Sequence, residues 1–336
     1  MPETTLPLGE GISNLPQNEN QKIRKSNSSS RKCSGNVQKA GETMYKKSKD
    51  DNQLICSAEA SGKDTNKGRI VIQCPAKINL DLKITSKRPD GFHNIKSVMQ
   101  TISLYDYLTL NAEPSGKFEM ALSGTSPEIP YDEKNIVYKA IMLFIERVNL
   151  PPHKICAYIE KNIPVSAGLA GGSTDAAGIL KGLNVYFNNP LSCAELHELC
   201  AKLGSDLNFC LEGGRKLTEG RGEILTPLPF EEFEVSLIKP LDLGISAKEA
   251  YMKFSAKKDA AKQGRENFKN DLEWAVIDDY EELQKIKSKY PASIMSGSGS
   301  AYFRIGGEFE PDEGYFVKNK LKSVPDGVRI ISSYEK

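Results

Sequence analysis

The sequence predicts an α+β fold, and three observations indicate it. Residues 69–84 and 95–110 have the strand-like character of half-buried β-structure, with apolar side chains alternating after Pro75. Residues 135–150 and 192–204 instead repeat their apolar side chains at helical spacing. These elements follow no regular βαβ repeat, which favours an α+β arrangement over a doubly wound sheet. The chain beyond position 67 suffices for one large domain or two coupled lobes.

Residues 1–67 differ in composition from everything that follows. Tyr45 is their only aromatic residue, and Asn, Ser and Lys dominate, as in residues 26–30. Such a segment buries too little apolar surface to offset the entropy lost on ordering, so we expect a disordered polar tail. A transit peptide is the alternative, because the segment is rich in Arg, Lys and Ser. Its glutamates at positions 3, 10, 19 and 42 count against that alternative.

The first predicted strand covers residues 69–84. After Pro75 its apolar side chains fall on even numbers and face the core, namely Ala76, Ile78, Leu80, Leu82 and Ile84. Lys77 and Asn79 therefore share the opposite face, and an isolated lysine on a strand is most often solvated. Residues 88–91 have the sequence Arg-Pro-Asp-Gly, which predicts a turn that leads into the second strand.

Two helices are delimited by their capping residues. Asn135 is placed to cap the first, which Pro151 and Pro152 would stop. Ser192 and Glu195 have the spacing of a capping box at the start of the second, and Gly204 would end it.

Between these helices, a loop of small residues opens a third helix. It consists of Pro164, Val165, Ser166, Ala167, Gly168, Leu169, Ala170, Gly171, Gly172, Ser173 and Thr174. Glycines let the backbone approach an anion, and the first free N–H groups of the helix point into the same space, so a phosphate fits here. The hydroxyl of Ser173 or Thr174 could hold phosphate oxygens or Mg²⁺. The loop lacks the Walker lysine, so a tight turn that packs helix on strand is the alternative.

Other candidate residues carry weaker signals. A second glycine loop, Ser296 to Gly299, precedes an alternating strand, but spacing alone does not show whether the two loops meet. Asp206 lies between a helix end and an apolar run, where a carboxylate caps or turns the chain more often than it catalyses. Phe92 and His93 follow the turn, and an aromatic beside a hydrogen-bonding ring could stack on a nucleobase and read its edge.

Charge and composition exclude several classes of partner. The chain carries 45 Lys+Arg against 44 Asp+Glu, whereas nucleic acids and anionic membranes select basic surfaces. No apolar run reaches 18 residues, and the seven cysteines include no CxxC pair. We therefore expect a small-molecule substrate, no nucleic-acid or membrane partner, and a cytoplasmic location, or a plastid one if the tail is a transit peptide.

Taken in order, the motifs resemble those of the GHMP small-molecule kinases. The three that carry the resemblance are Pro75-Ala76-Lys77-Ile78-Asn79-Leu80, the loop of residues 164–177, and Ser296-Gly297-Ser298-Gly299. Further features are shared with the branch of the family whose substrate carries a cytidine diphosphate group. They are Arg88-Pro89-Asp90-Gly91-Phe92-His93, Leu203-Gly204-Ser205-Asp206, Gly220-Arg221-Gly222-Glu223 and Asn270-Asp271-Leu272-Glu273.

The resemblance implies a two-lobed α+β fold, with an N-terminal lobe at 68–230 that carries the ATP loop and a C-terminal lobe at 231–336. It implies ATP and Mg²⁺ as cofactors, with ATP bound at the loop that begins at Pro164. The implied reaction transfers the γ-phosphoryl group to the 2-hydroxyl of a methylerythritol derivative that carries cytidine diphosphate, on the non-mevalonate isoprenoid route. A monomer and a homodimer both remain open.

The resemblance also implies roles for individual residues. Lys77 and Asp206 match the catalytic pair of the family. Phe92 and His93 fall where the family holds the cytosine ring, and Asn79 falls where it lines the acceptor site. Ala170 stands where many members have a further glycine, a change that the loop tolerates if φ there is negative. The alternatives are a kinase of this type that acts on another alcohol, and a nucleotide-binding module without turnover.

Overall fold

The computed structural model describes residues 68–260 and 264–333, all of which belong to one unit of the chain, Gly35–Lys336. The polar tail predicted for residues 1–67 lies outside the described residues. Whether that tail is disordered or a transit peptide therefore stays a prediction.

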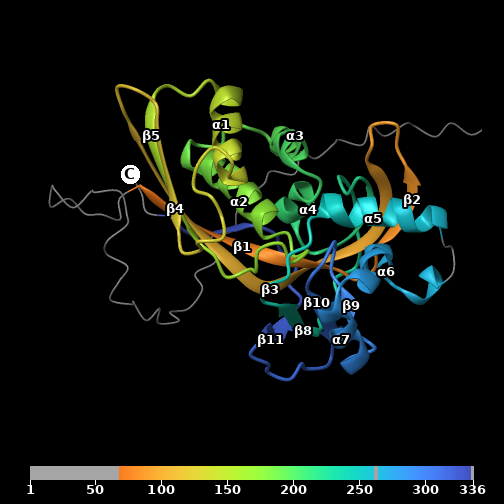
Figure 1. Ribbon diagram of the computed structural model, residues 1–336. Coiled ribbons are helices and arrows are strands. Elements are labelled where there is room, and N and C mark those ends of the chain that lie inside the picture. The colour runs from red at the N-terminus through yellow and green to blue at the C-terminus, as the bar shows by residue number, and fades with distance from the viewer. Residues whose placement is uncertain (1–67, 261–263, 334–336) are drawn as a thin grey trace, which may run out of the picture. The chain divides into compact units, whose positions relative to one another are not determined.

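β3 (His93–Pro114) is the central strand of the larger sheet, which has eight strands among the described residues (Figure 1). Its neighbours on the main path are β1 (Arg69–Asn79) and β5 (His153–Glu160), both antiparallel to it. The other strands extend the sheet: β2 (Lys83–Lys87) and β6 (Arg215–Gly220) pair with β3, β4 (Glu119–Gly124) with β5, β7 (Ile224–Pro227) with β6, and β12 (Arg329–Ser333) with β1.

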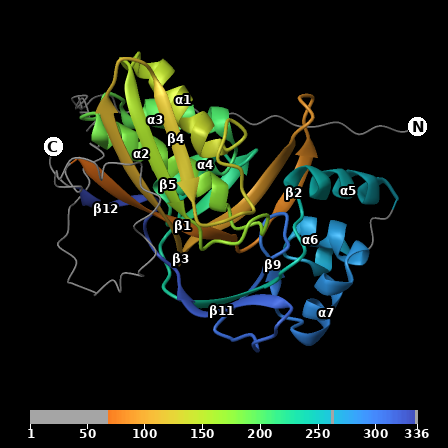
Figure 2. The same cartoon turned by 60° about the vertical axis from the view of Figure 1, so that its left-hand side comes forward.

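Helices α1 to α4 gather over one face of this sheet, as Figures 1 and 2 show. They are α1 (Ile136–Val148), α2 (Gly171–Tyr186), α3 (Cys193–Leu203) and α4 (Leu207–Glu212). The contact between α2 and β1 is close, since a Cβ on Gly178 would lie 2.5 Å from Cys74 Sγ. The helix that follows the small-residue loop is therefore packed directly on the strand that carries Lys77.

The capping residues set the boundaries of both helices that the spacing predicts. Asn135 Oδ1 accepts a hydrogen bond from the Val137 N–H at 2.8 Å, and α1 ends at Asn149, which adopts the left-handed conformation (φ 50°) before the two prolines. Ser192 and Glu195 form the capping box of α3. Both helices are confirmed.

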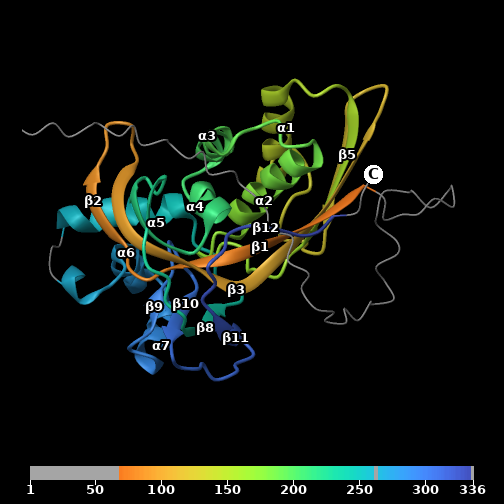
Figure 3. The same ribbon diagram turned by 180° about the vertical axis from the view of Figure 1, so that it is seen from behind.

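A second, four-stranded sheet packs on the side of β1 and β3 that faces away from these helices (Figure 3). Its antiparallel order is β11 (Tyr315–Lys322), β8 (Glu234–Pro240), β10 (Tyr302–Ile305) and β9 (Ile294–Met295). The helices that accompany it are α5 (Ala247–Ala260), α6 (Asp271–Val276) and α7 (Glu281–Lys289), with short 3₁₀ turns at Arg265–Asn267 and Ile277–Asp279. Ala76 and Ile78 of β1 join Leu237 and Phe303 in the core between the two sheets.

A bulge in the β1–β3 pairing, between Pro75 and Ala76, reverses the faces of β1. Before it, Ile72 and Cys74 pack beneath the helices, whereas after it Ala76 packs against the second sheet. The side chain of Lys77 is thereby turned toward the helix side of the sheet, where the small-residue loop lies.

The predicted strand over residues 69–84 is confirmed in part. It is interrupted, because β1 ends at Asn79 and β2 begins at Lys83. Of the side chains predicted to face the core, Leu80 is partly buried and the others are buried. Lys77 and Asn79 are buried as well, with 3% and 0% of their surfaces exposed. The expectation of a solvated lysine was wrong, because loops of the chain cover this face. The turn at residues 88–91 is confirmed, with φ +86° at Gly91 and its N–H bonded to the Arg88 carbonyl at 3.2 Å.

The fold class is confirmed as α+β with two sheets. The lobe limits at 68–230 and 231–336 stay a prediction, and β12 returns the chain to the larger sheet after the second sheet is complete. Within residues 68–260 and 264–333, none of the helices combines the length and the apolar character needed to cross a bilayer.

A pH-dependent contact links α3 to α4. His197 Nε2 lies 3.1 Å from Glu212 Oε1, and Lys216 Nζ lies 2.8 Å from Glu212 Oε2. The hydrogen bond with Glu212 raises the pKa of His197, and the same bond lowers the pKa of Glu212 to about 2.

We predict that this contact makes stability fall as the pH rises above neutrality. Because the pKa of His197 is raised on folding, its contribution is complete below about pH 6.5 and is lost as the pH rises through the raised value. Both side chains are partly exposed, so the loss is at most about 1 kcal/mol. Urea unfolding between about pH 6 and 9 measures it, and His197→Gln is the control whose stability should vary less over that window. An equal slope in both proteins would contradict the assignment.

Candidate functional site

One large cavity of about 1170 Å³ brings together residues from the whole described chain. Lys77, Asn79, Phe92, His93 and Asp206 line it, as do residues 164–173 of the small-residue loop. Thr174 does not line it, because its side chain is fully buried in α2. The sequence thus identified the main walls of the cavity, although only the fold shows that they enclose one space.

In the lining of the cavity, Lys77 and Asp206 form an ion pair. Lys77 Nζ lies 3.4 Å from Asp206 Oδ2. The ammonium also donates hydrogen bonds to Asn79 Oδ1 at 2.6 Å and to the Gly168 carbonyl at 3.0 Å. Because three acceptors surround the ammonium, its position in the cavity is closely determined.

Asp206 occupies the N-cap position of α4, but its side chain makes no capping hydrogen bond. Its side chain is 30% exposed and turned to Lys77 rather than to the helix backbone. The prediction that Asp206 caps a helix is therefore confirmed for its position, but its side chain does not make the capping hydrogen bond. A carboxylate held this way can accept a hydrogen bond or a proton from a group bound in the cavity.

The two glycine loops are in contact. Ser296 Oγ donates to the Gly168 carbonyl at 3.0 Å, and the Ala301 N–H donates to the Ala167 carbonyl at 3.1 Å. Gly168 has φ +72°, and a Cβ on it would lie 2.0 Å from the Ser296 carbonyl oxygen. Only glycine permits both this conformation and this approach.

The N-terminus of α2 opens into the cavity at the small-residue loop. Ala170 precedes the helix with φ +59°, and its carbonyl accepts the first helical hydrogen bond, from the Thr174 N–H at 2.9 Å. The condition under which alanine is tolerated at position 170, a negative φ, is not met, because the loop reaches the helix through a left-handed residue. Gly171 and Gly172 leave the first N–H groups of the helix open to an anion.

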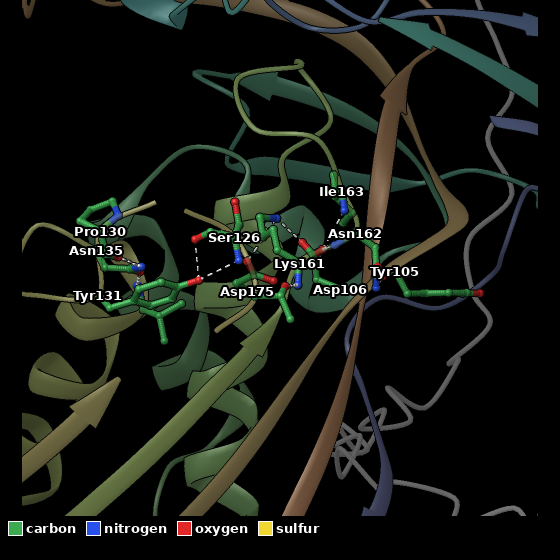
Figure 4. Close-up of polar contacts among 12 residues, drawn as sticks. Tyr105, Asp106, Ser126, Pro130, Tyr131, Asn135, Lys161, Asn162, Ile163 and Asp175 are labelled. Carbon is green, nitrogen blue, oxygen red and sulfur yellow. Dashed lines mark hydrogen bonds and ion pairs between the residues drawn. The ribbon is translucent and has the colours of Figure 1, made fainter. Parts of the chain in front are cut away.

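A buried ionic cluster that the sequence did not indicate lies beneath this loop (Figure 4). Lys161 Nζ bonds the carboxylate of Asp106 and lies 3.4 Å from Asp175 Oδ2. Asp106 Oδ1 also accepts the N–H groups of residues 162 and 163, at 2.6 and 2.8 Å. The three members of the cluster come from β3, the end of β5 and α2, so no local pattern could have revealed it.

Burial dominates the protonation of this cluster. It raises the pKa of Asp175 well above its usual value, although Lys161 opposes the shift. Burial alone would lower the pKa of Lys161, but Asp175 and Asp106 raise it, so the ammonium stays charged. A charged Lys161 offsets negative charge directly below the loop, where a Cβ on Gly171 would come within 2.6 Å of its Nζ.

One end of the cavity is apolar and is shaped by the loop before α1. Ile129, Pro130 and Ile159 line it. Figure 4 shows how the loop is held: the Tyr131 hydroxyl donates to the Ser126 carbonyl at 2.9 Å, and Asn135 Nδ2 donates to the Pro130 carbonyl at 2.6 Å. Sequence analysis missed this wall, because no periodic pattern distinguishes it.

The opposite end is aromatic. Phe92 is 50% exposed, and the Arg221 guanidinium lies 4.8 Å from its ring centroid. The ring of His93 stacks on Tyr251 at 5.2 Å, and His93 Nε2 lies 3.2 Å from Ser255 Oγ. Sequence analysis missed Tyr251 and Ser255, although their spacing of four residues places them on one face of α5.

Comparisons with known proteins agree with this geometry. Residues 135–214 match the family model for the GHMP kinases N terminal domain. A 4-diphosphocytidyl-2-C-methyl-D-erythritol kinase from Clostridium botulinum (strain Alaska E43 / Type E3) is 39% identical over 275 residues, which cover 75% of this chain and 96% of that protein. A protein of the same name from Synechococcus sp. (strain JA-2-3B'a(2-13)) is 37% identical over 261 residues, 68% of this chain and 83% of that one.

Solved structures show the same arrangement. A crystal structure of a 4-(cytidine 5'-diphospho)-2C-methyl-D-erythritol kinase superposes with a TM-score of 0.59 and 26% identity, covering 76% of this chain and all of that one. A mevalonate kinase from Methanococcus jannaschii superposes with a TM-score of 0.54 at 12% identity, covering 76% and 98% of the two chains. The second likeness concerns the fold alone.

Two residues of the small-residue loop with positive φ, Gly168 and Ala170, predict opposite effects of substitution. Gly168→Ala should lower the free energy of unfolding by more than about 2 kcal/mol, because the methyl group meets the Ser296 carbonyl and φ is positive. Ala170→Gly should raise it by up to about 1 kcal/mol, because relief of the left-handed strain outweighs the added flexibility of the unfolded chain. Urea unfolding measures both. A destabilised Ala170→Gly protein would mean that its methyl contacts outweigh the strain.

The buried cluster predicts a large loss of stability for Lys161→Met. Removing the ammonium leaves two buried carboxyl groups without the cation between them, and we expect a loss of about 3–5 kcal/mol. Asp175→Asn, in contrast, leaves the pair of Lys161 and Asp106 intact and should cost less. The double variant Lys161→Met/Asp175→Asn should be more stable than Lys161→Met alone, as chemical denaturation at neutral pH would show. A loss below about 1 kcal/mol for Lys161→Met would contradict a charged cluster.

Proposed function

The chain belongs to the GHMP kinases and, within them, to the 4-diphosphocytidyl-2-C-methyl-D-erythritol kinases, and we propose from this that it phosphorylates the 2-hydroxyl of 4-(cytidine 5'-diphospho)-2-C-methyl-D-erythritol with ATP. It is thus an ATP-dependent small-molecule kinase of isoprenoid biosynthesis. The observation that carries the proposal is the Lys77–Asp206 pair, 3.4 Å apart, beside the carbonyl of Gly168. This pair lies where the phosphate-binding loop meets the rest of the cavity.

The small-residue loop is the proposed site of the triphosphate. Its glycines and the open N-terminus of α2 offer backbone N–H groups to an anion, and the partial positive charge of the helix end favours negative charge there. The apolar end of the cavity, with Ile129, Pro130 and Ile159, suits the adenine ring. The nucleotide would then extend from that end across the loop to Lys77.

For Mg²⁺, the chain offers hydroxyl groups rather than a carboxylate cage. Among the described residues, no group of three or more His, Cys, Asp or Glu side chains could hold a metal ion. Ser173 lines the cavity, whereas Thr174 Oγ1 is buried in the helix. This supports Ser173 as the hydroxyl beside an ion held mainly by phosphate oxygens, a mode of binding typical of Mg²⁺. When bound, the ion neutralises charge on the triphosphate.

Asp206 and Lys77 divide the work of phosphoryl transfer. Asp206 orients the acceptor hydroxyl and takes its proton as the oxygen bonds to the γ-phosphorus, while the bond from that phosphorus to the bridging oxygen breaks and ADP leaves. Lys77 holds the Asp206 carboxylate in place through their ion pair and offsets the charge that develops beside the attacking oxygen. Transfer of this kind requires little covalent chemistry from the protein, so positioning by these groups supplies most of the effect.

The aromatic end is the proposed site of the cytidine diphosphate. Phe92 offers an exposed ring for stacking on cytosine, and His93 offers a hydrogen-bonding edge held in place by Tyr251. Cationic side chains suited to a diphosphate also line the cavity, at Lys87, Arg221 and Lys248.

Asn79 stays a prediction as a residue of the acceptor site. It lines the cavity, but its Oδ1 accepts from Lys77 Nζ and its Nδ2 donates to Ser97 Oγ at 2.8 Å. These contacts support a role in orienting Lys77. The oligomeric state, monomer or homodimer, likewise stays a prediction.

We predict that Asp206→Asn and Lys77→Met lower kcat by about 10²–10⁴-fold while KM for ATP changes by less than about threefold. Neither side chain belongs to the proposed triphosphate loop, so the loss should fall on the chemical step. ADP release that depends on the cytidine substrate measures both constants. Equal loss of ATP affinity in the two variants would contradict this division of roles.

The same assay separates the alternatives. Mevalonate and homoserine serve as control acceptors, and a preference for either would replace the proposed substrate with another alcohol. A parent protein that binds ATP but releases no ADP with any acceptor would be a nucleotide-binding module. The ion pair between Lys77 and Asp206 favours an enzyme that turns over rather than a binding module.

A further inference from the structure

Residues 270–273 at the start of α6 form a buried polar segment whose role the reaction does not yet explain. Asn270, Asp271 and Glu273 are each at most 1% exposed. Buried polar groups are costly unless specific partners satisfy them, so the partners of this segment reveal what it holds. None of these three side chains lines the cavity, but two of the residues that the segment bonds, Leu82 and Gly297, do line it.

Asn270 holds the second glycine loop. Its Nδ2 donates to the carbonyls of Met295 at 2.7 Å and Gly297 at 2.8 Å, while its Oδ1 accepts from the Leu272 N–H at 2.8 Å. Glu273 Oε2 accepts from the Met295 N–H at 3.2 Å. Because one amide group bonds two carbonyls that are two residues apart, it determines the curvature of the loop between them.

That loop in turn positions the proposed ATP side of the site. Ser296 Oγ bonds the carbonyl of Gly168 at 3.0 Å and accepts from the Asn79 N–H at 3.3 Å. A Cβ on Gly297 would lie 3.1 Å from Lys77 Nζ. The second glycine loop therefore contacts Asn270 on one side, and the small-residue loop and Lys77 on the other.

Asp271 holds a different element. Its Oδ2 accepts from the Ile84 N–H at 2.6 Å, and its own N–H donates to the Leu82 carbonyl at 2.9 Å. Its carboxylate also forms ion pairs with Lys83, at 3.4 Å, and Arg265. These bonds anchor β2, whose end pairs with the start of β3 and carries the turn with Phe92 and His93.

We propose that Asn270 and Asp271 are positioning residues with separate tasks, Asn270 for the ATP side of the site and Asp271 for the acceptor side. Because the two residues are adjacent in the chain, the segment fixes the position of the ATP subsite relative to the acceptor subsite. This inference rests on the proposed kinase function, since it assigns each residue to one substrate.

Two adjacent, nearly isosteric substitutions test it. Asn270→Asp keeps the acceptor for Leu272 and removes both donors to the loop, so we expect kcat to fall at least about tenfold and KM for ATP to rise at least about fivefold, with KM for the cytidine substrate within about twofold. Asp271→Asn weakens the anchor of β2, so we expect the opposite pattern: KM for the cytidine substrate rises at least about fivefold and KM for ATP stays within about twofold.

The two variants serve as matched controls, because the residues are neighbours and equally buried. A merely structural role would lower the active fraction and the melting temperature of both while leaving both KM values unchanged, and that result would overturn the proposal. So would the same KM pattern in both variants. If Asn270→Asp does not fold, Glu273→Gln, which weakens the bond to Met295 and the pairing with Lys287, should show the ATP-side pattern at smaller size.

A binding measurement separates this inference from the proposed function. Affinity for a non-hydrolysable ATP analogue, measured by calorimetry, should fall for Asn270→Asp and not for Asp271→Asn. If the parent protein phosphorylates no cytidine substrate but this difference is found, the proposed function fails and the ATP half of the inference stands. If the parent is active and the difference is absent, the inference alone fails.

Discussion

The position of the Lys77 ammonium is the constraint on which the rest of the site depends. A buried cation is costly unless acceptors surround it, and Lys77 meets this requirement through Asp206, Asn79 and the Gly168 carbonyl. These acceptors come from α4, from β1 itself and from the loop before α2. The ammonium can be buried only if all these segments have reached their places, so the fold and the reacting geometry are formed together.

Close backbone contact makes this arrangement possible. The bulge after Pro75 turns Lys77 toward the helices, and Gly168 allows the loop to approach Ser296 within a distance that any side chain would prevent. The second sheet contributes its glycine loop to the same point. The cavity is thus lined by segments attached to both sheets, because the loop between β9 and β10 and helix α5 join the small-residue loop around it.

Charge in the site is organised in layers around the proposed triphosphate position. Lys77 lies at the acceptor side, and Lys161 lies below the loop between Asp106 and Asp175. Residues 270–273 lie farther from this position. Their side chains bond backbone N–H and C=O groups of the surrounding segments and do not line the cavity, apart from Leu272. Rigid support of this kind matters for phosphoryl transfer, because the reaction depends on alignment more than on covalent participation by the protein.

The sequence by itself determined the elements whose causes are local. Asn135 and the Ser192–Glu195 box set helix ends and Gly91 set a turn, because capping and φ preference depend on neighbouring residues. The motifs at Lys77, Gly168 and Ser296 indicated the family through their residue types and their order along the chain. Only the tertiary structure decided that Lys77 is buried, that Ala170 is left-handed, and that Lys161 joins two aspartates. These features arise from contacts between residues far apart in the chain, and such contacts leave no periodic trace in the sequence.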